Sequence, residues 1–103
     1  MGVVFRKINI ELPAGTVRER FVFEGRVQGV GFRFTAKGFA NKYHVTGWAE
    51  NEDDGTVCAE MQGLPEDIEA VLAGLNRTEP IRIDNMTRER IDIKPKEKSF
   101  LMG

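Results

Sequence analysis

The sequence contains very few residues that form covalent cross-links, metal sites or acid–base centres. It has one cysteine, Cys58, and one histidine, His44, among 103 residues. One cysteine cannot form an intramolecular disulfide or a cysteine-rich metal site, and such sparse use is typical of a reducing compartment. We therefore expect no metal, no other cofactor and a cytoplasmic location.

Long apolar runs and an excess of positive charge are also absent. No run approaches the length of a transmembrane helix or of a signal-peptide core. The 15 Lys and Arg residues are balanced by 16 Asp and Glu residues, for a net charge of −1. Nucleic-acid and anionic-membrane binders depend on surplus basic charge. We expect neither kind of partner, and we expect the chain to be a monomer.

What the sequence does contain is a glycine-rich stretch, GRVQGVGFR at residues 25–33. The aromatic and β-branched run at 20–24 that precedes it predicts a strand. The residues that follow predict a helix, because apolar side chains recur there at helical spacing: Phe32, Ala36, Phe39, Ala40 and Tyr43. A strand therefore passes through a glycine-rich turn into a helix.

This turn has the chemistry of an anion cradle. Its glycines lack a Cβ, so successive backbone N–H groups can curl around an anion, and the helix N-terminus adds partial positive charge. The glycine pattern is that of neither a dinucleotide loop nor a nucleoside-triphosphate loop, and a tight turn between packed elements also explains it. Arg33 favours the cradle, because it offers a planar fork of donors where the turn meets the helix.

Together with the strand and helix already described, the remaining chain predicts a β-α-β-β-α-β order. Strands are expected over 45–50 and 56–62, joined by a turn at 51–55 whose Asp-Gly pair is a hairpin signal. A helix that begins at Pro65 carries an apolar stripe: Ile68, Val71, Leu72 and Leu75. A fourth strand, in one piece or two, is expected over 81–93, and a short last one over 99–102. This order predicts a ferredoxin-like α+β sandwich, an antiparallel sheet with two helices on one face, with an added C-terminal strand.

Residues 1–15 are predicted to be an N-terminal extension, and residues 16–103 the folded domain. Ile8, Ile10 and Leu12 alternate with polar residues as in a half-buried strand, and the pattern ends at Pro13. Such a segment can pair with a sheet edge, pair with another molecule or remain a loose arm. The sequence does not favour one of the three.

Two motifs in the chain resemble those of acylphosphatases, small enzymes that hydrolyse acyl phosphates to a carboxylate and phosphate. The stretch at 25–33 resembles the phosphate loop of that family. GWAEN at 47–51, followed by GTV at 55–57 and by Gly63, resembles its second signature. Together with the element order, the resemblance spans about residues 20–103.

The resemblance implies a role for each matching residue. Arg33 would bind the phosphate, together with the loop that leads to it: Gln28, Gly29, Val30, Gly31 and Phe32. Asn51 would position the attacking water. From its position alone, Asn51 is a turn residue that caps a hairpin. The loop before it favours the catalytic role.

The reaction suits a chain with so few acid–base residues. An acyl phosphate expels a carboxylate, which is already a stable anion near neutral pH, so no general acid is needed. Phosphoryl transfer mainly requires charge neutralisation and in-line placement of the nucleophile. The loop and Arg33 would supply the first requirement, and the amide of Asn51 the second.

Two residues depart from the pattern of the family. Glu50 stands where a basic or small neutral residue is usual, and its carboxylate would repel a dianionic substrate unless it points away. His44 replaces a common glycine at the end of the first helix, where histidine tolerates the left-handed conformation better than most residues. The other acidic residues at 52–54 are expected to form a solvated turn rather than a metal site.

The alternative is a non-catalytic ferredoxin-like domain that binds an anion or another ligand. An RNA-binding version would need its aromatic signature on a strand, whereas VGFRF at 30–34 lies on the predicted turn and helix. The same loop also occurs in an accessory domain of a large hydrogenase-maturation carbamoyltransferase. Asn51 discriminates between the classes, because a binder needs only the cradle, while a hydrolase also needs an oriented water.

Overall fold

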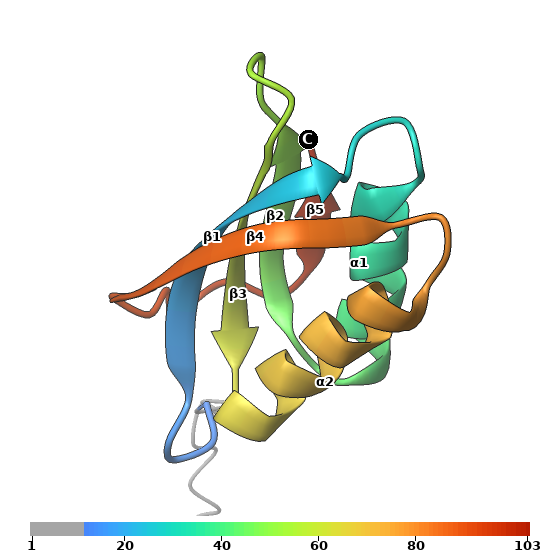
Figure 1. Ribbon diagram of the computed structural model, residues 1–103. Coiled ribbons are helices and arrows are strands. Elements are labelled where there is room, and N and C mark those ends of the chain that lie inside the picture. Colours follow the sequence, from blue (N-terminus) through green and yellow to red (C-terminus); the bar gives the residue numbers. More distant parts are fainter. Residues whose placement is uncertain (1–11) are drawn as a thin grey trace, which may run out of the picture.

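The strands form one sheet, and both helices cover the same face of it (Figure 1). The computed structural model describes residues 12–103. In chain order the elements are β1 (Val17–Arg26), α1 (Phe32–Lys42), β2 (Thr46–Asn51), β3 (Val57–Gly63), α2 (Pro65–Arg77), β4 (Arg82–Ile91) and β5 (Phe100–Met102). The predicted ferredoxin-like β-α-β-β-α-β order, with its added C-terminal strand, is confirmed.

The strand order in the sheet is β4-β1-β3-β2-β5. β1 pairs antiparallel with both β3 and β4, and β3 pairs antiparallel with β2. β5 instead lies parallel to β2, an arrangement that the sequence does not predict. The segment of alternating charged residues was expected to form one strand or two. It forms one continuous strand, β4, which pairs with β1 along its length.

The core lies between the sheet and the helices. Phe21 and Phe23 of β1 face Ala59 and Val57 of β3 in register, and all four are fully buried. The helices contribute the apolar stripes expected from their spacing: Phe32, Ala36, Ala40, Ile68, Val71 and Leu75. Each buried large apolar side chain contributes roughly 1.5–3 kcal/mol relative to its exposed state. This layer fixes α1 against the sheet, and with it the turn that precedes α1.

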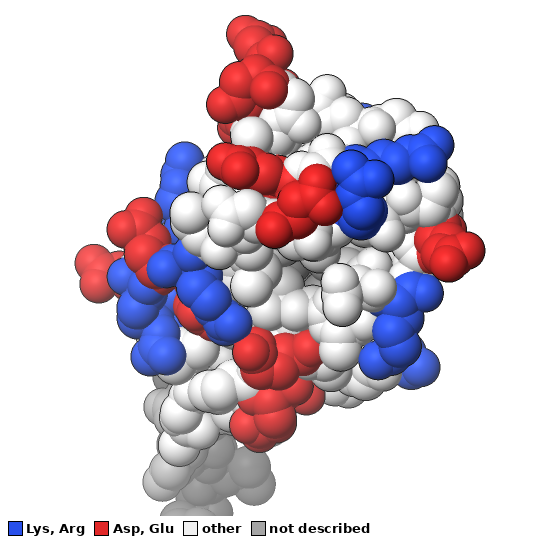
Figure 2. All heavy atoms as spheres, viewed as in Figure 1, with Lys and Arg blue, Asp and Glu red and all other residues white. Residues whose placement is uncertain are grey.

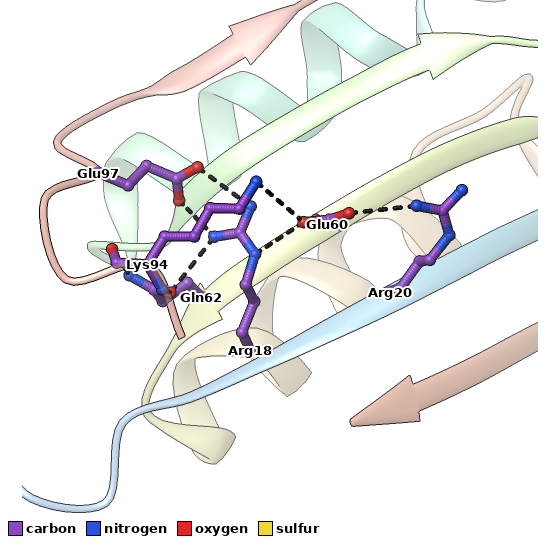
Figure 3. Close-up of polar contacts among 6 residues, drawn as sticks. All are labelled: Arg18, Arg20, Glu60, Gln62, Lys94 and Glu97. Atoms are coloured by element: carbon purple, nitrogen blue, oxygen red, sulfur yellow. Dashed lines mark hydrogen bonds and ion pairs between the residues drawn. The ribbon is translucent and has the colours of Figure 1, made fainter. Parts of the chain in front are cut away.

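The helix-free face of the sheet carries a buried polar cluster (Figure 3). Arg18 is fully buried, and its guanidinium donates to the carboxylate of Glu60 on β3 and to that of Glu97, each at 2.8 Å. Gln62 exchanges hydrogen bonds of 2.9 and 2.7 Å with the backbone of Lys94. These contacts hold the connection between β4 and β5 against the sheet, and so bring β5 to the edge opposite β4.

The expected extra strand or arm at 1–15 lies almost entirely outside the described residues. Of this segment, the structure describes residues 12–15, which lead into β1 through a turn. The backbone N–H and the hydroxyl of Thr16 both donate to the carbonyl of Pro13. The division at residue 15 therefore stays a prediction.

Candidate active site

The turn between β1 and α1 has a backbone that only glycine adopts without strain at two positions. Gly29 has φ of 72° and Gly31 has φ of 74°, both in the left-handed region. A Cβ added at either residue would meet no atom within 4 Å. Glycine is therefore required here by backbone conformation and not by crowding, and the surface of the turn stays open to a ligand.

Helix α1 begins at Phe32, and no side chain caps its N-terminal N–H groups. Gly31 is the N-cap residue, and the first turn of the helix contains no acidic residue. Helix α2 differs, since Glu66 and Asp67 lie in its first turn. The first N–H groups of a helix lack intrahelical partners and carry partial positive charge. The start of α1 is thus free to receive an external anion.

A cavity of about 130 Å³ lies where this turn meets the ends of β2 and β5. Its lining consists of Val27, Gly29, Gly31, Phe32, Arg33, Phe34, Asn51 and Met102. The fold therefore brings Arg33 and Asn51 to one cavity, although they are far apart along the chain. Of the predicted loop residues, Gly29, Gly31 and Phe32 also line it. Gln28 and Val30 do not.

The alternation of side chains along β2 directs Asn51 toward the cavity. Ala49 is fully buried on the face that the helices cover, and Asn51, two residues further on, shares that face. Asn51 ends the strand opposite Val57 of β3. Glu50 is exposed and points to the opposite face of the sheet. The carboxylate that departs from the family's pattern is therefore directed away from the site.

Gln28 connects the loop to the β2–β3 hairpin. Its side-chain amide donates to the backbone carbonyls of Glu52 at 2.7 Å and of Thr56 at 2.9 Å. The side chain is thus committed to the protein, and only the backbone N–H of Gln28 is left to contact an anion. No local pattern predicts this link, because its acceptors are backbone atoms of a distant turn.

Arg33 is half-buried beside the last described residue of the chain. Its Nη1 donates to the backbone carbonyl of Gly103, whose own N–H donates to the carbonyl of Ala49 at 2.8 Å. Because a guanidinium has five N–H donors in a planar fork, this contact leaves donors for an anion. The bond also fixes the side chain at the rim of the cavity.

The acidic residues at 52–54 form the exposed tip of the β2–β3 hairpin, as expected. Figure 2 shows acidic side chains gathered there, with both signs of charge interspersed over the rest of this face. Asp54 accepts hydrogen bonds from the hydroxyl and the backbone N–H of Thr56, and these bonds lower the pKa of its carboxyl. Within residues 12–103, no group of His, Cys, Asp and Glu is arranged to hold a metal ion.

The remaining candidates have structural explanations. His44 has φ of 59°, the left-handed conformation expected after α1. Cys58 is buried on β3, and burial raises the pKa of its thiol. Neither residue lines the cavity. Over the described part of the chain, no helix is long and apolar enough to cross a membrane.

Three lining residues were missed by reasoning from sequence: Val27, Phe34 and Met102. Val27 is buried and belongs to the core. Phe34 does carry a signal, since it is an aromatic residue that falls off the apolar stripe of its helix. Met102 carries none, because only the parallel pairing of β5 with β2 brings it to the site.

Comparison with known proteins points to one family. The family model described as acylphosphatase matches residues 19–102. The acylphosphatase of Geobacillus thermodenitrificans is 40% identical over 84 residues, which cover 81% of this chain and 89% of that protein. The crystal structure of acylphosphatase from Bacillus subtilis is similar with a TM-score of 0.76 and 25% identity, covering 84% of this chain and 98% of that one.

A similar domain also occurs inside a larger protein. The crystal structure of full-length HypF in its phosphate- and nucleotide-bound form matches with a TM-score of 0.76 and 28% identity. The match covers 85% of this chain but only 12% of that one. The relatives that this chain matches over most of their own length are the acylphosphatases named above.

Proposed function

The chain belongs to the acylphosphatase family, and we propose that Arg33 and the glycine-rich loop hold the phosphate of its substrate while Asn51 orients the attacking water. The reaction is the hydrolysis of an acyl phosphate to a carboxylate and inorganic phosphate. Water forms a bond to phosphorus, the bond from phosphorus to the bridging oxygen breaks, and the acyl group leaves as a carboxylate that keeps the bonding electrons. The proton of the water passes to solvent.

The phosphate would lie against the start of α1. The open backbone of the turn and the uncapped N-terminus of the helix present N–H groups and partial positive charge to it. Arg33 adds a full positive charge and hydrogen bonds that a planar guanidinium directs to two oxygens at once. These groups neutralise the charge on the equatorial oxygens, which is the main requirement of phosphoryl transfer.

Asn51 would bind the water that attacks phosphorus. A side-chain amide both accepts and donates hydrogen bonds, so it can fix the position of a water without being charged itself. A neutral group is well suited here, since a carboxylate in its place would repel the substrate. No group needs to protonate the departing carboxylate. The mechanism therefore consists of positioning and electrostatic stabilisation.

One observation carries this proposal: a single cavity is lined by the glycine turn, by Arg33 and by Asn51. A domain that only bound an anion would need the first two. The side-chain alternation that brings Asn51 to the same cavity supports catalysis, and the alternative of a non-catalytic binder is not favoured.

The test is hydrolysis of benzoyl phosphate by wild type, Asn51→Ala and Arg33→Ala, with a chelator present. We expect turnover in the wild type and a loss of about 100-fold or more in kcat for Asn51→Ala, because its role is confined to the transition state. Inorganic phosphate should still bind this variant. Arg33→Ala should lose both phosphate binding and turnover.

The design separates the two roles by two measurements. Phosphate affinity comes from calorimetric titration, and turnover from release of benzoate. If Asn51→Ala lost phosphate binding and turnover to the same degree, the proposed division of roles would be wrong. If wild type bound phosphate but hydrolysed nothing, the chain would be an anion-binding domain.

Three finer properties belong to the proposal as well. We expect a monomer in the cytoplasm, with neither nucleic acid nor membrane as a partner. The sparse cysteine and the balanced charge support this expectation. Size-exclusion chromatography with light scattering tests the first property directly.

A further inference from the structure

Phe34 is the most exposed of the large apolar side chains in the described part of the chain. It is 73% exposed, although it lies in the first turn of a packed helix. Two positions beyond Phe32 it is rotated by about 200° around the helix axis. The same spacing that buries Phe32 therefore turns Phe34 away from the core. An aromatic ring left in water at the rim of an anion site calls for a functional explanation.

The side chain of Phe34 is directed toward the site, and the residue one turn later on the helix does not cover it. Side chains on a helix lean toward its N-terminus, so Phe34 leans over the glycine turn and lines the cavity together with Arg33. The residue one turn later, which would cover it, is Gly38. A Cβ at Gly38 would meet nothing within 4 Å, so no packing contact requires glycine there. The ring of Phe34 keeps an open face.

Few other apolar surfaces at the cavity can receive part of a substrate. Val27 and Phe32 are 1% and 2% exposed, so they form the floor. Among the apolar side chains of the lining, Phe34 and Met102 are the exposed ones, Met102 at 42%. They come from different layers, since Phe34 belongs to α1 and Met102 to the sheet.

In-line displacement decides between these two residues. The acyl group must leave on the side of phosphorus opposite the attacking water. Asn51, which orients that water, belongs to the sheet, as does Met102. The leaving group would point away from Asn51, and Phe34 is the exposed apolar side chain of the lining that does not belong to the sheet.

We propose that Phe34 contacts the acyl group of the substrate and selects acyl phosphates whose acyl group is aromatic, or otherwise large and apolar, over those with a small or charged one. This inference rests on the proposed function of the site. An aromatic acyl group gains area burial and ring contact on Phe34, an acetyl group gains little, and a charged group would lose hydration there. The contact exists before and during the reaction, so it acts on KM more than on kcat.

The experiment measures both turnover and binding for an aromatic and a small substrate. Benzoyl phosphate and acetyl phosphate report hydrolysis. Phenacylphosphonate and acetonylphosphonate, in which a methylene group replaces the bridging oxygen, report binding without any reaction. For wild type we expect the aromatic member of each pair to be favoured by about tenfold in KM or Kd.

Phe34→Ala should reduce that preference to about twofold or less, with the KM for acetyl phosphate and the affinity for inorganic phosphate retained. Phe34→Tyr, which keeps the ring, should retain the preference. Leu101→Ala is the matched control, because Leu101 is 60% exposed beside Met102 but does not line the cavity. It should leave both preferences unchanged.

Two results would overturn the contact: an unchanged preference in Phe34→Ala, which includes an equal loss for both substrates, or no preference in the wild type. The binding arm keeps this question separate from catalysis. If wild type preferred phenacylphosphonate but hydrolysed neither acyl phosphate, the proposed hydrolysis would be wrong and the acyl contact would stand. If wild type and Phe34→Ala both hydrolysed the two substrates with the same KM, the proposed hydrolysis would stand and the acyl contact would be wrong.

Discussion

Adjacent residues at the end of β2 face opposite sides of the sheet. Asn51 lines the cavity, whereas Glu50 is exposed on the face that no helix covers. A charge in high-dielectric surroundings loses most of its influence over a Debye length of roughly 8 Å at physiological ionic strength. The orientation of a single side chain thus decides whether an acidic residue beside a phosphate site is harmful.

Substitution of Glu50 by Gln should change the KM for acyl phosphates by less than about twofold at physiological salt. The reason is that Glu50 is exposed and its side chain lies on the face of the sheet opposite the cavity. Steady-state kinetics at low and at physiological ionic strength measure the effect. A large decrease in KM that persists in salt would show that the carboxylate faces the site.

At the scale of elements, Gln28 joins the glycine-rich loop to the hairpin that carries Asn51. Two hydrogen bonds, to the carbonyls of Glu52 and Thr56, fix the distance between the two parts of the site. In the proposed mechanism the loop holds the phosphate and the hairpin holds the water. Their relative position therefore depends on this side chain.

Gln28→Ala should lower kcat by about tenfold while phosphate affinity stays within about twofold, because misplacement of the nucleophile affects the reaction more than ground-state binding. Each lost hydrogen bond should also cost about 1 kcal/mol of stability. Kinetics and phosphate titration give the split. If Kd rose as much as kcat fell, Gln28 would act on the loop itself rather than on its alignment.

The buried cluster around Arg18 is a second link between elements, on the other face of the sheet (Figure 3). It joins β1 to β3 through Glu60 and to the connection before β5 through Glu97. Replacing one partner of a buried pair leaves an uncompensated charge, which is more costly than the pair itself is favourable. The cluster thus holds β5, and Met102 with it, beside the site.

Arg18→Met should lower the free energy of unfolding by about 3–5 kcal/mol. The matched control is Arg82→Met, since Arg82 forms an ion pair with Asp84 but its side chain is 68% exposed; its loss should have a much smaller effect on stability. Urea unfolding monitored by circular dichroism measures both. Equal effects at the two positions would mean that burial does not determine the strength of these pairs.

At the scale of the whole molecule, stability should depend on pH through Glu60. Burial raises the pKa of this carboxyl. The hydrogen bond from Arg18 and the charges of Arg18, Lys94 and Arg20 together lower it by more, so the net pKa lies below its usual 4.5. An acid with a lowered folded pKa contributes stability above its unfolded pKa. That contribution is lost as the pH falls through the folded pKa.

The free energy of unfolding should therefore decrease as the pH falls below about 4.5. Glu60→Gln should be less stable than wild type near neutral pH, and this difference should shrink in acid because the variant has no carboxyl to protonate. Urea unfolding at a series of pH values gives both curves. A difference that stayed constant with pH would show that the Glu60 carboxylate contributes nothing as a charge.

Much of the fold could be predicted because the relevant signals are local. Apolar spacing gave both helices, the Asp-Gly pair gave the hairpin, and His44 fits a left-handed helix end. The site was predicted in part for the same reason, since Gly29, Gly31 and Arg33 lie within one turn. The roles assigned to Arg33 and Asn51 stay predictions until the variants are measured.

The chain by itself determined the turn chemistry and the element order, because backbone conformation and burial depend on neighbours within a few residues. Only the tertiary structure decided which side of the sheet Asn51 and Glu50 face, where the amide of Gln28 ends, and that Met102 reaches the cavity beside Phe34. These features depend on strand register and on the parallel edge pairing of β5. Such contacts join residues far apart in the chain, and no local pattern encodes them.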